Sequence, residues 1–186
     1  MALPPPSVAR QPLHRRVVRV DAFRREDGLF DLEARLTDTK SYAVDLLSGP
    51  REAGDPVHDM LLRVTIDAQF TIVGVETDSE RVPNVGVCEA VGPKYARLVG
   101  LNLLRGFRKQ VQARLGRTEG CTHLSELATV LPTAALQSIA HLVRPIDPLS
   151  SEPPFYIGQC HAYERSGELV RRHYPQWFVQ AEKSDP

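Results

Sequence analysis

The feature that most constrains the fold is a strict alternation of apolar and polar residues over positions 30–37. Its apolar positions are Phe30, Leu32, Ala34 and Leu36. A period of two places successive side chains on opposite faces, which predicts a β-strand with one buried face. The turn sequence at 26–28 precedes it, and Val18 and Val20 alternate with polar residues before that turn. These patterns together predict a β-hairpin.

A second alternation follows over residues 58–66, with His58 on the same strand face as Met60, Leu62, Val64 and Ile66. The turn at 67–69 leads into another apolar run at 70–76, and residues 40–46 predict a further short strand. Residues 48–56 contain Gly and Pro pairs that are typical of an exposed loop. The first half of the chain is therefore expected to form an antiparallel meander of about five strands.

The second half reads mainly as helix. Leu104, Phe107, Val111 and Leu115 have helical spacing, and Gly116 is a natural stop for that helix. A second helix is predicted from about Thr122 towards His141, and Pro132 is expected to kink or divide it. Residues 144–154 are rich in proline and predict an extended surface crossing. Residues 155–163 and 168–174 are interpreted as a closing hairpin.

These elements predict an α+β fold in which a curved antiparallel sheet of about six to seven strands packs against two main helices. A ligand cavity is expected between the inner face of the sheet and the second helix. We expect a single domain over residues 15–178, with a mobile proline-rich tail at 1–14 and a C-terminal tail at 179–186.

Composition excludes several classes of protein. Lys+Arg and Asp+Glu both number 23, which argues against a surface for nucleic acid or for an anionic membrane. Three widely spaced cysteines argue against a disulfide framework, and no segment has the pattern of a signal peptide or a membrane span. The expected setting is the cytoplasm. The oligomeric state stays open, with a homodimer as one possibility.

The richest chemical segment is residues 120–127, GCTHLSEL, at the expected start of the second helix. Thr122 is interpreted as the N-cap. His123 and Glu126 are three apart on one helix face and could act as an acid–base pair. The alternative is a solvated helix end, with Glu126 close to the positive end of the helix dipole.

His58 ends an apolar strand face, so it is either a satisfied core residue or the wall of a pocket. Lys40, Tyr42 and Arg24 lie near strand ends and could line the same cavity, whereas Asp59 should face away and be structural. Cys121 could be a nucleophile only if it lies in the loop before the helix, where it could reach His123.

Zinc binding is the remaining chemical alternative. Cys121, His123, Cys160, His161 and His58 could supply ligands, but their spacing matches no standard zinc motif. We therefore expect neither a metal nor another cofactor. A Walker loop, a dinucleotide-binding glycine motif and a G-x-S-x-G elbow are also absent from the sequence.

Five stretches of the chain resemble a bacterial family known as domain of unknown function 2889. They are residues 24–33, 38–40, 56–60, 120–127 and 131–137, and the resemblance covers roughly residues 16–141, most of the folded part of the chain. The resemblance implies an association with the bacterial breakdown of lignin-derived aromatic compounds, including the cofactor-free release of formaldehyde from a phenolic dimer.

The resulting hypothesis is a cofactor-independent acid–base lyase that acts on a small aromatic compound. His58, His123, Glu126, Tyr42 and Lys40 are the residues expected to divide the proton transfers. Substrate contacts are expected from Arg24, Cys121 and Thr122. Two other classes stay open: a non-catalytic protein that binds an aromatic or carboxylate ligand in the same cavity, and a partner-interaction module.

Overall fold

The computed structural model describes residues 3–144 and 150–180. The chain divides into two compact units, Met1–Val143 and Arg144–Pro186. The single domain expected over 15–178 spans both units and stays a prediction. The outer ends of both expected tails, and residues 145–149 of the proline-rich segment, lie outside the described residues.

The first unit is built on a four-stranded antiparallel sheet in the order β1–β2–β5–β6. Its strands are β1 (His14–Arg24), β2 (Phe30–Lys40), β5 (Pro56–Ile66) and β6 (Ile72–Arg81). The two long alternations form the central pair, in which Leu32 lies opposite Val64 and Leu36 opposite Met60. Every predicted core residue of these runs is buried: Phe30, Leu32, Leu36, Leu62, Val64 and Ile66. The α+β class is confirmed.

The strand count differs from the expectation. Within the described residues, β3 (Val44–Leu46) and β4 (Gly49–Arg51) pair only with each other, as a separate two-stranded ribbon. The region expected to be one strand and a loop is therefore a small hairpin outside the main sheet. Glycine and proline in this segment permit the tight turn but leave too few apolar residues to add a strand to the core.

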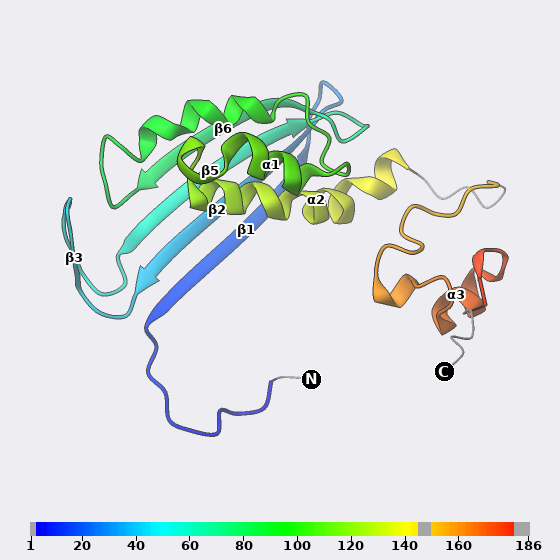
Figure 1. The fold of residues 1–186 in the computed structure, drawn as a ribbon, viewed down its shortest axis with the longest axis horizontal. Coiled ribbons are helices and arrows are strands. Elements are labelled where there is room, and N and C mark those ends of the chain that lie inside the picture. The colour runs from blue at the N-terminus through cyan, green and yellow to red at the C-terminus, as the bar shows by residue number, and fades with distance from the viewer. Residues whose placement is uncertain (1–2, 145–149, 181–186) are drawn as a thin grey trace. The chain divides into compact units, whose positions relative to one another are not determined.

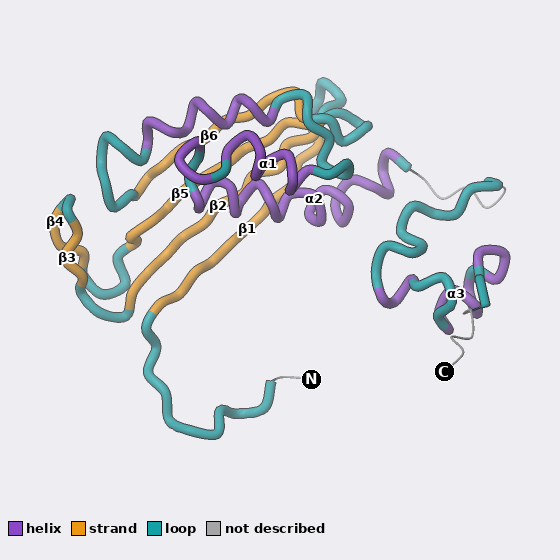
Figure 2. Tube along the Cα trace, viewed as in Figure 1, coloured by secondary structure: helices purple, strands orange, loops and turns teal. Residues whose placement is uncertain are grey.

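The helices of the first unit lie across one face of the sheet (Figure 1). They are η1 (Glu89–Leu98), α1 (Phe107–Leu115), η2 (Arg117–Glu119) and α2 (Thr122–Val143). Figure 2 shows η1 and α1 following β6 in the chain and α2 crossing the sheet after them. Even-numbered residues of β2 and β5 face these helices, which creates the core.

The opposite sheet face carries paired charges. Arg35 holds Asp59 through two hydrogen bonds, at 2.7 Å from Nε and 2.6 Å from Nη2. Asp59 therefore faces away from the helices, as the alternation predicts. Arg63 joins Glu33 and Glu76 in the same way.

Helix α2 continues through Pro132 and is not divided there, whereas the alternative of a kink at this residue stays a prediction. Proline removes one backbone N–H from the helical ladder. Buried residues lie on both sides of it, among them Leu131 and Ala135. Packing of these side chains offsets the lost hydrogen bond, because most helical stability in proteins comes from tertiary contacts.

The second unit contains η3 (His161–Tyr163), α3 (Glu168–His173) and η4 (Pro175–Trp177). The predicted closing hairpin is wrong, since residues 168–173 form a helix and residues 155–163 form turns and a 3₁₀ segment. Glu168 lies in the first turn of α3 and Arg171, Arg172 and His173 in the last, an order that suits the helix dipole. Tyr156, Tyr163 and Tyr174 pack their rings together.

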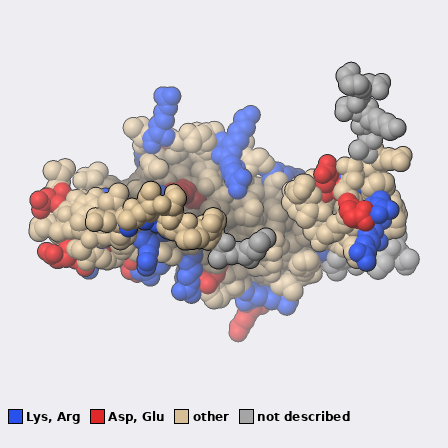
Figure 3. Space-filling view, turned by 90° about the horizontal axis from the view of Figure 1, so that it is seen from below, with Lys and Arg blue, Asp and Glu red and all other residues tan. Residues whose placement is uncertain are grey.

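Charged side chains of both signs are interspersed over the face shown in Figure 3. None of the helices in the described residues combines the length and the apolar character needed to cross a membrane. The cytoplasmic setting and the possible homodimer stay predictions.

Candidate functional site

A row of polar residues crosses three strands at one end of the sheet. Arg16 of β1 lies directly opposite Asp38 of β2, and Asp38 lies directly opposite His58 of β5. Opposed residues in an antiparallel pair share a face, so all three side chains belong to the face that the helices cover. Asp38 is only 4% exposed, an unusual environment for a carboxylate.

Asp38 is kept ionised by its partners. Arg16 donates from Nε to Oδ1 at 2.8 Å and from Nη2 to Oδ2 at 2.7 Å, and His14 Nε2 lies 2.9 Å from Oδ1. Burial raises the pKa of Asp38, but the hydrogen bonds from Arg16 and His14 outweigh burial and lower the pKa to about 2. A buried negative charge is therefore present at the site at neutral pH.

Two imidazoles stack beside this carboxylate. The ring centroids of His58 and His123 are 3.8 Å apart, with 31° between the ring planes. His58 Nδ1 lies 3.2 Å and His123 Nε2 lies 3.6 Å from Asp38 Oδ2. His58 Nδ1 is buried and has no well-aligned hydrogen bond to any described residue, so its contact with Asp38 is an electrostatic one.

Both imidazoles are neutral near pH 7. Burial is the largest cause that lowers the pKa of His58, followed by the repulsion that a protonated His123 would exert on a protonated His58. Burial also lowers the pKa of His123, and the nearby charge of Arg16 lowers it further. The Asp38 charge raises both pKa values but does not reverse either shift. A neutral imidazole keeps one lone pair, which makes it a base.

A buried tyrosine holds the start of α2 in place. Tyr95 is fully buried, and its hydroxyl accepts a hydrogen bond from Cys121 N at 3.1 Å. The same hydroxyl lies 2.8 Å from Cys121 O and 2.8 Å from Ser125 Oγ. A Cβ at position 120 would lie 2.4 Å from Leu115 O, so this approach requires Gly120.

The residue before the helix is Cys121, whose carbonyl accepts from Ser125 N at 2.9 Å. Thr122 is already the first helical residue, so the predicted N-cap is one position too late. Because Cys121 lies in the loop, its Sγ reaches His123 Nδ1 at 3.8 Å. The sequence analysis required Cys121 to lie in the loop before the helix in order to reach His123, and it does.

A pocket of about 540 Å³ opens in front of the two imidazoles. Its wall includes His58 and Met60 of β5, residues 82–88 in part, the first half of η1, and residues near the start of α2. Its lining includes several apolar side chains, among them Met60, Val82, Val87 and Val91. Lys94 of η1 contributes an ammonium group. This mixture of apolar surface and a few polar groups is typical of small-molecule sites.

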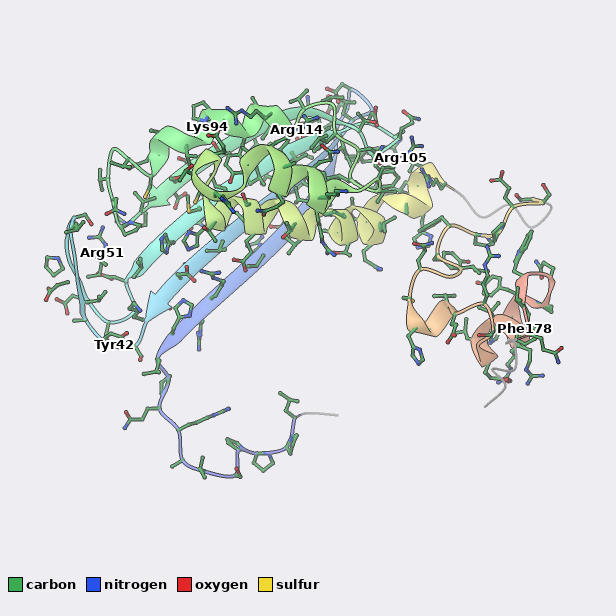
Figure 4. The ribbon with its side chains drawn as sticks, viewed as in Figure 1. Tyr42, Arg51, Lys94, Arg105, Arg114 and Phe178 are labelled. Atoms are coloured by element: carbon green, nitrogen blue, oxygen red, sulfur yellow. The ribbon has the colours of Figure 1, made fainter. Side chains whose placement is uncertain are left out.

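Four of the predicted site residues line this pocket: His58, His123, Cys121 and Thr122. Glu126 is close by but forms its ion pair with Arg16. Three others are not among the residues that line it. Lys40 and Tyr42 contact each other at 3.3 Å, with Tyr42 beside the β3–β4 ribbon (Figure 4). Arg24 pairs with Phe30, at the opposite end of β1 from Arg16.

Asp38, His14, Arg16 and Lys94 were not predicted as site residues. Asp38 could have been found, because the alternation that starts at Phe30 places position 38 on the buried face. A carboxylate on that face, at the end of the strand that pairs with His58, indicates a polar cluster. Nothing in the sequence pairs Arg16 or Lys94 with this cluster before the tertiary structure is known.

Asp38, His58 and His123 also have the composition of a metal site, with one ligand atom of each lying within 4.8 Å of the others. The guanidinium of Arg16 opposes this use, since it already occupies both oxygens of Asp38. A bound cation would face that positive charge at close range. Cys160 and His161, the other zinc candidates, belong to the second unit.

Comparison with known protein families matches residues 14–137 to the family described as "Protein of unknown function (DUF2889)". The match covers about two thirds of the chain and includes both halves of the histidine pair. The chain belongs to the DUF2889 family. The part of the chain shared with DUF2889 thus contains Asp38, His58 and His123, and ends within α2. No curated protein matches the chain, and no solved structure matches it.

Proposed function

We propose that the protein is a cofactor-independent acid–base lyase that acts on a small aromatic compound. The observation that carries the proposal is the stacked pair His58 and His123, neutral, on the wall of an apolar pocket and backed by the buried carboxylate of Asp38. Two adjacent bases with lowered pKa values suit a reaction that moves several protons at neutral pH.

The position of Asp38 also suggests which imidazole nitrogens accept protons from the substrate. A carboxylate near His58 Nδ1 and His123 Nε2 favours the tautomers that carry hydrogen on those atoms. The lone pairs then lie on His58 Nε2 and His123 Nδ1, the nitrogens that do not face Asp38. The position of Cys121, a pocket residue, beside His123 Nδ1 supports this orientation.

The specific reaction we propose is the release of formaldehyde from a phenylcoumaran-like phenolic dimer. One imidazole removes the phenol proton, and the phenolate electrons open the ring ether to give a quinone methide. The departing aryl oxygen takes up a proton. An imidazole then removes the hydroxymethyl proton, and the carbon–carbon bond breaks to release formaldehyde. The electrons of that bond restore the aromatic ring as a phenolate, which takes a proton back from the imidazolium. The two products together contain the same atoms as the substrate, so no oxidant or reductant is consumed.

The test is to incubate the purified protein with a panel of phenolic dimers and to measure formaldehyde and the absorbance of the conjugated product. We expect His58→Ala and His123→Ala to abolish turnover and to leave the melting temperature nearly unchanged. His161→Ala, in a fully exposed histidine of the second unit, is the matched control. If both site variants have lower melting temperatures but retain wild-type activity per folded molecule, the proposal that His58 and His123 act in one site is wrong.

The same assay separates catalysis from binding alone. A non-catalytic protein would bind members of the panel, and His58→Ala would weaken that binding, but formaldehyde would not form with any member.

A second candidate is a metal-dependent function, favoured by the cluster of Asp38, His58 and His123. We expect the purified protein to contain no stoichiometric zinc and to be unaffected by chelators, because the guanidinium of Arg16 already binds both oxygens of Asp38. Elemental analysis that finds close to one metal ion per chain, lost in His58→Ala, would favour the metal centre over the acid–base site.

A further inference from the structure

The charges that line the pocket are unbalanced. Among the described residues that form its wall, Lys94 is the single Lys, Arg, Asp or Glu. The remaining lining residues are apolar, hydroxyl, thiol, amide or imidazole groups. The carboxylate of Asp38 lies behind the imidazoles and is not part of the wall. A ligand in this pocket therefore meets one formal positive charge and no negative one.

The ammonium of Lys94 is only weakly neutralised by protein. Lys94 Nζ lies 3.9 Å from Glu119 Oε2, which is at the limit of an ion pair. Glu119 is held more closely by Arg97, whose Nη1 is 2.8 Å from the same oxygen. The Lys94 side chain is 40% exposed, so it can turn toward a bound anion. Figure 4 shows Lys94 on η1, above the sheet edge formed by β6.

The start of α2 adds to the same positive potential. Gly120, Cys121 and Thr122 lie on the pocket wall, at the N-terminus of a 22-residue helix. The first N–H groups of a helix have no acceptor within it, and the helix dipole is positive at this end. Lys94 and the N-terminus of α2 thus favour an anionic ligand group in the pocket. Asp38 would repel the same group if it lay close to the imidazoles on the Asp38 side.

We propose that the pocket selects aromatic anions, with a carboxylate or phenolate group of the ligand held at Lys94 and its ring against Met60, Val82 and Val91. This inference deepens the proposed lyase function and rests on the same pocket. For that reaction, Lys94 would stabilise the phenolate that His58 or His123 generates. Lys94 would then be a specificity-determining residue that contacts the substrate.

The test compares two ligands that differ mainly in charge, 4-hydroxybenzoate and 4-hydroxybenzamide, by calorimetry or NMR titration of the full-length protein at low salt. We expect the wild-type protein to bind the acid about tenfold more tightly, the size expected of one charge-assisted contact. Lys94→Gln should lose this preference and keep its affinity for the amide. Lys94→Arg should restore most of the preference, because it restores the charge.

Lys109→Gln is the matched control, since Lys109 is an exposed residue of α1 outside the pocket wall. It should bind both ligands as the wild type does. Equal affinity of the wild type for acid and amide, or an equal loss of both ligands in Lys94→Gln, would overturn the proposal. The titrations need no turnover. A preference for the acid that depends on Lys94, without formaldehyde release from any dimer, would support the anion site and refute only the lyase.

Discussion

At the scale of single residues, the properties of the site depend on which side chains are ionised and which are neutral at pH 7. Asp38 stays ionised although it is buried, because Arg16 and His14 donate hydrogen bonds to it. His58 and His123 stay neutral next to it, because burial disfavours their charged forms. At neutral pH the site therefore contains two neutral imidazoles, which can accept protons, beside one ionised carboxylate.

This arrangement predicts a pH dependence of stability. The pKa values of His58 and His123 are lower in the folded protein than the ordinary value of 6.5. As the pH falls below about 6.5, the unfolded chain therefore binds protons at these positions before the folded chain does, and the free energy of unfolding decreases. The lost stability returns when the pH is raised again.

Thermal unfolding between pH 8 and pH 5 measures this effect. The double variant His58→Gln/His123→Gln should lose less stability across that range than the wild type, whereas His161→Gln should follow the wild type. Parallel curves for all three proteins would contradict the lowered pKa values. The contribution of Asp38 is lost only at much lower pH, since its folded-state pKa is about 2 and its ordinary value is 3.8.

At the scale of elements, β2 and β5 supply core residues and also two residues of the site, Asp38 from β2 and His58 from β5. Leu62 is fully buried and lies opposite Ala34 in the central strand pair. Leu62→Ala should lower the free energy of unfolding by roughly 2–4 kcal/mol, because it leaves a cavity in the core. Chemical denaturation measures the loss. Arg63→Ala, on the exposed face of the same strand, should cost well under half as much; equal losses would contradict the assignment of faces.

The start of α2 is an element whose position depends on one hydroxyl group. Tyr95→Phe removes the partner of Cys121 N and Cys121 O in a buried place, at a cost of about 1–3 kcal/mol. The first turn of α2 should loosen, and with it the contact between His123 and His58. We expect ligand affinity or turnover to fall more than stability alone explains, and the NMR titration of His123 to move towards the ordinary histidine pKa.

Tyr42→Phe is the control for that variant, because Tyr42 is 46% exposed and does not line the pocket. Its stability and its His123 titration should match the wild type. An unchanged His123 titration in a folded Tyr95→Phe protein would show that Tyr95 does not position the imidazole.

At the scale of the whole molecule, every residue that lines the site pocket belongs to the first unit. A chain that ends after Arg144 should therefore keep its cooperative unfolding transition and its ligand affinity. Calorimetry and the benzoate titration check this directly. Loss of folding in the shortened chain would instead support a single domain that extends to residue 178.

Elements with a strong local pattern could be predicted from the amino-acid sequence. A strict alternation identifies a strand and its buried face, which is why the two central strands, their core residues and the inward direction of His58 could be predicted. Helical spacing and a glycine stop identified the end of α1 at Leu115 and the start of α2 at Thr122, although α1 begins at Phe107 and not at Leu104. Residues 168–173 form a helix although their pattern predicts a strand, because a six-residue run is less than two helical turns and is too short to distinguish helical spacing from alternation.

Which of these residues come into contact depends on tertiary packing. The register of three strands places Arg16, Asp38 and His58 in one row, and the packing of α2 on the sheet brings His123 onto that row. Tyr95 and Lys94 reach the site from η1, and the local pattern of that segment does not indicate that the start of α2 is its neighbour. Such contacts depend on strand register and on how the helices pack against the sheet. Both are determined by the free energy of the whole core, which a local sequence pattern does not show.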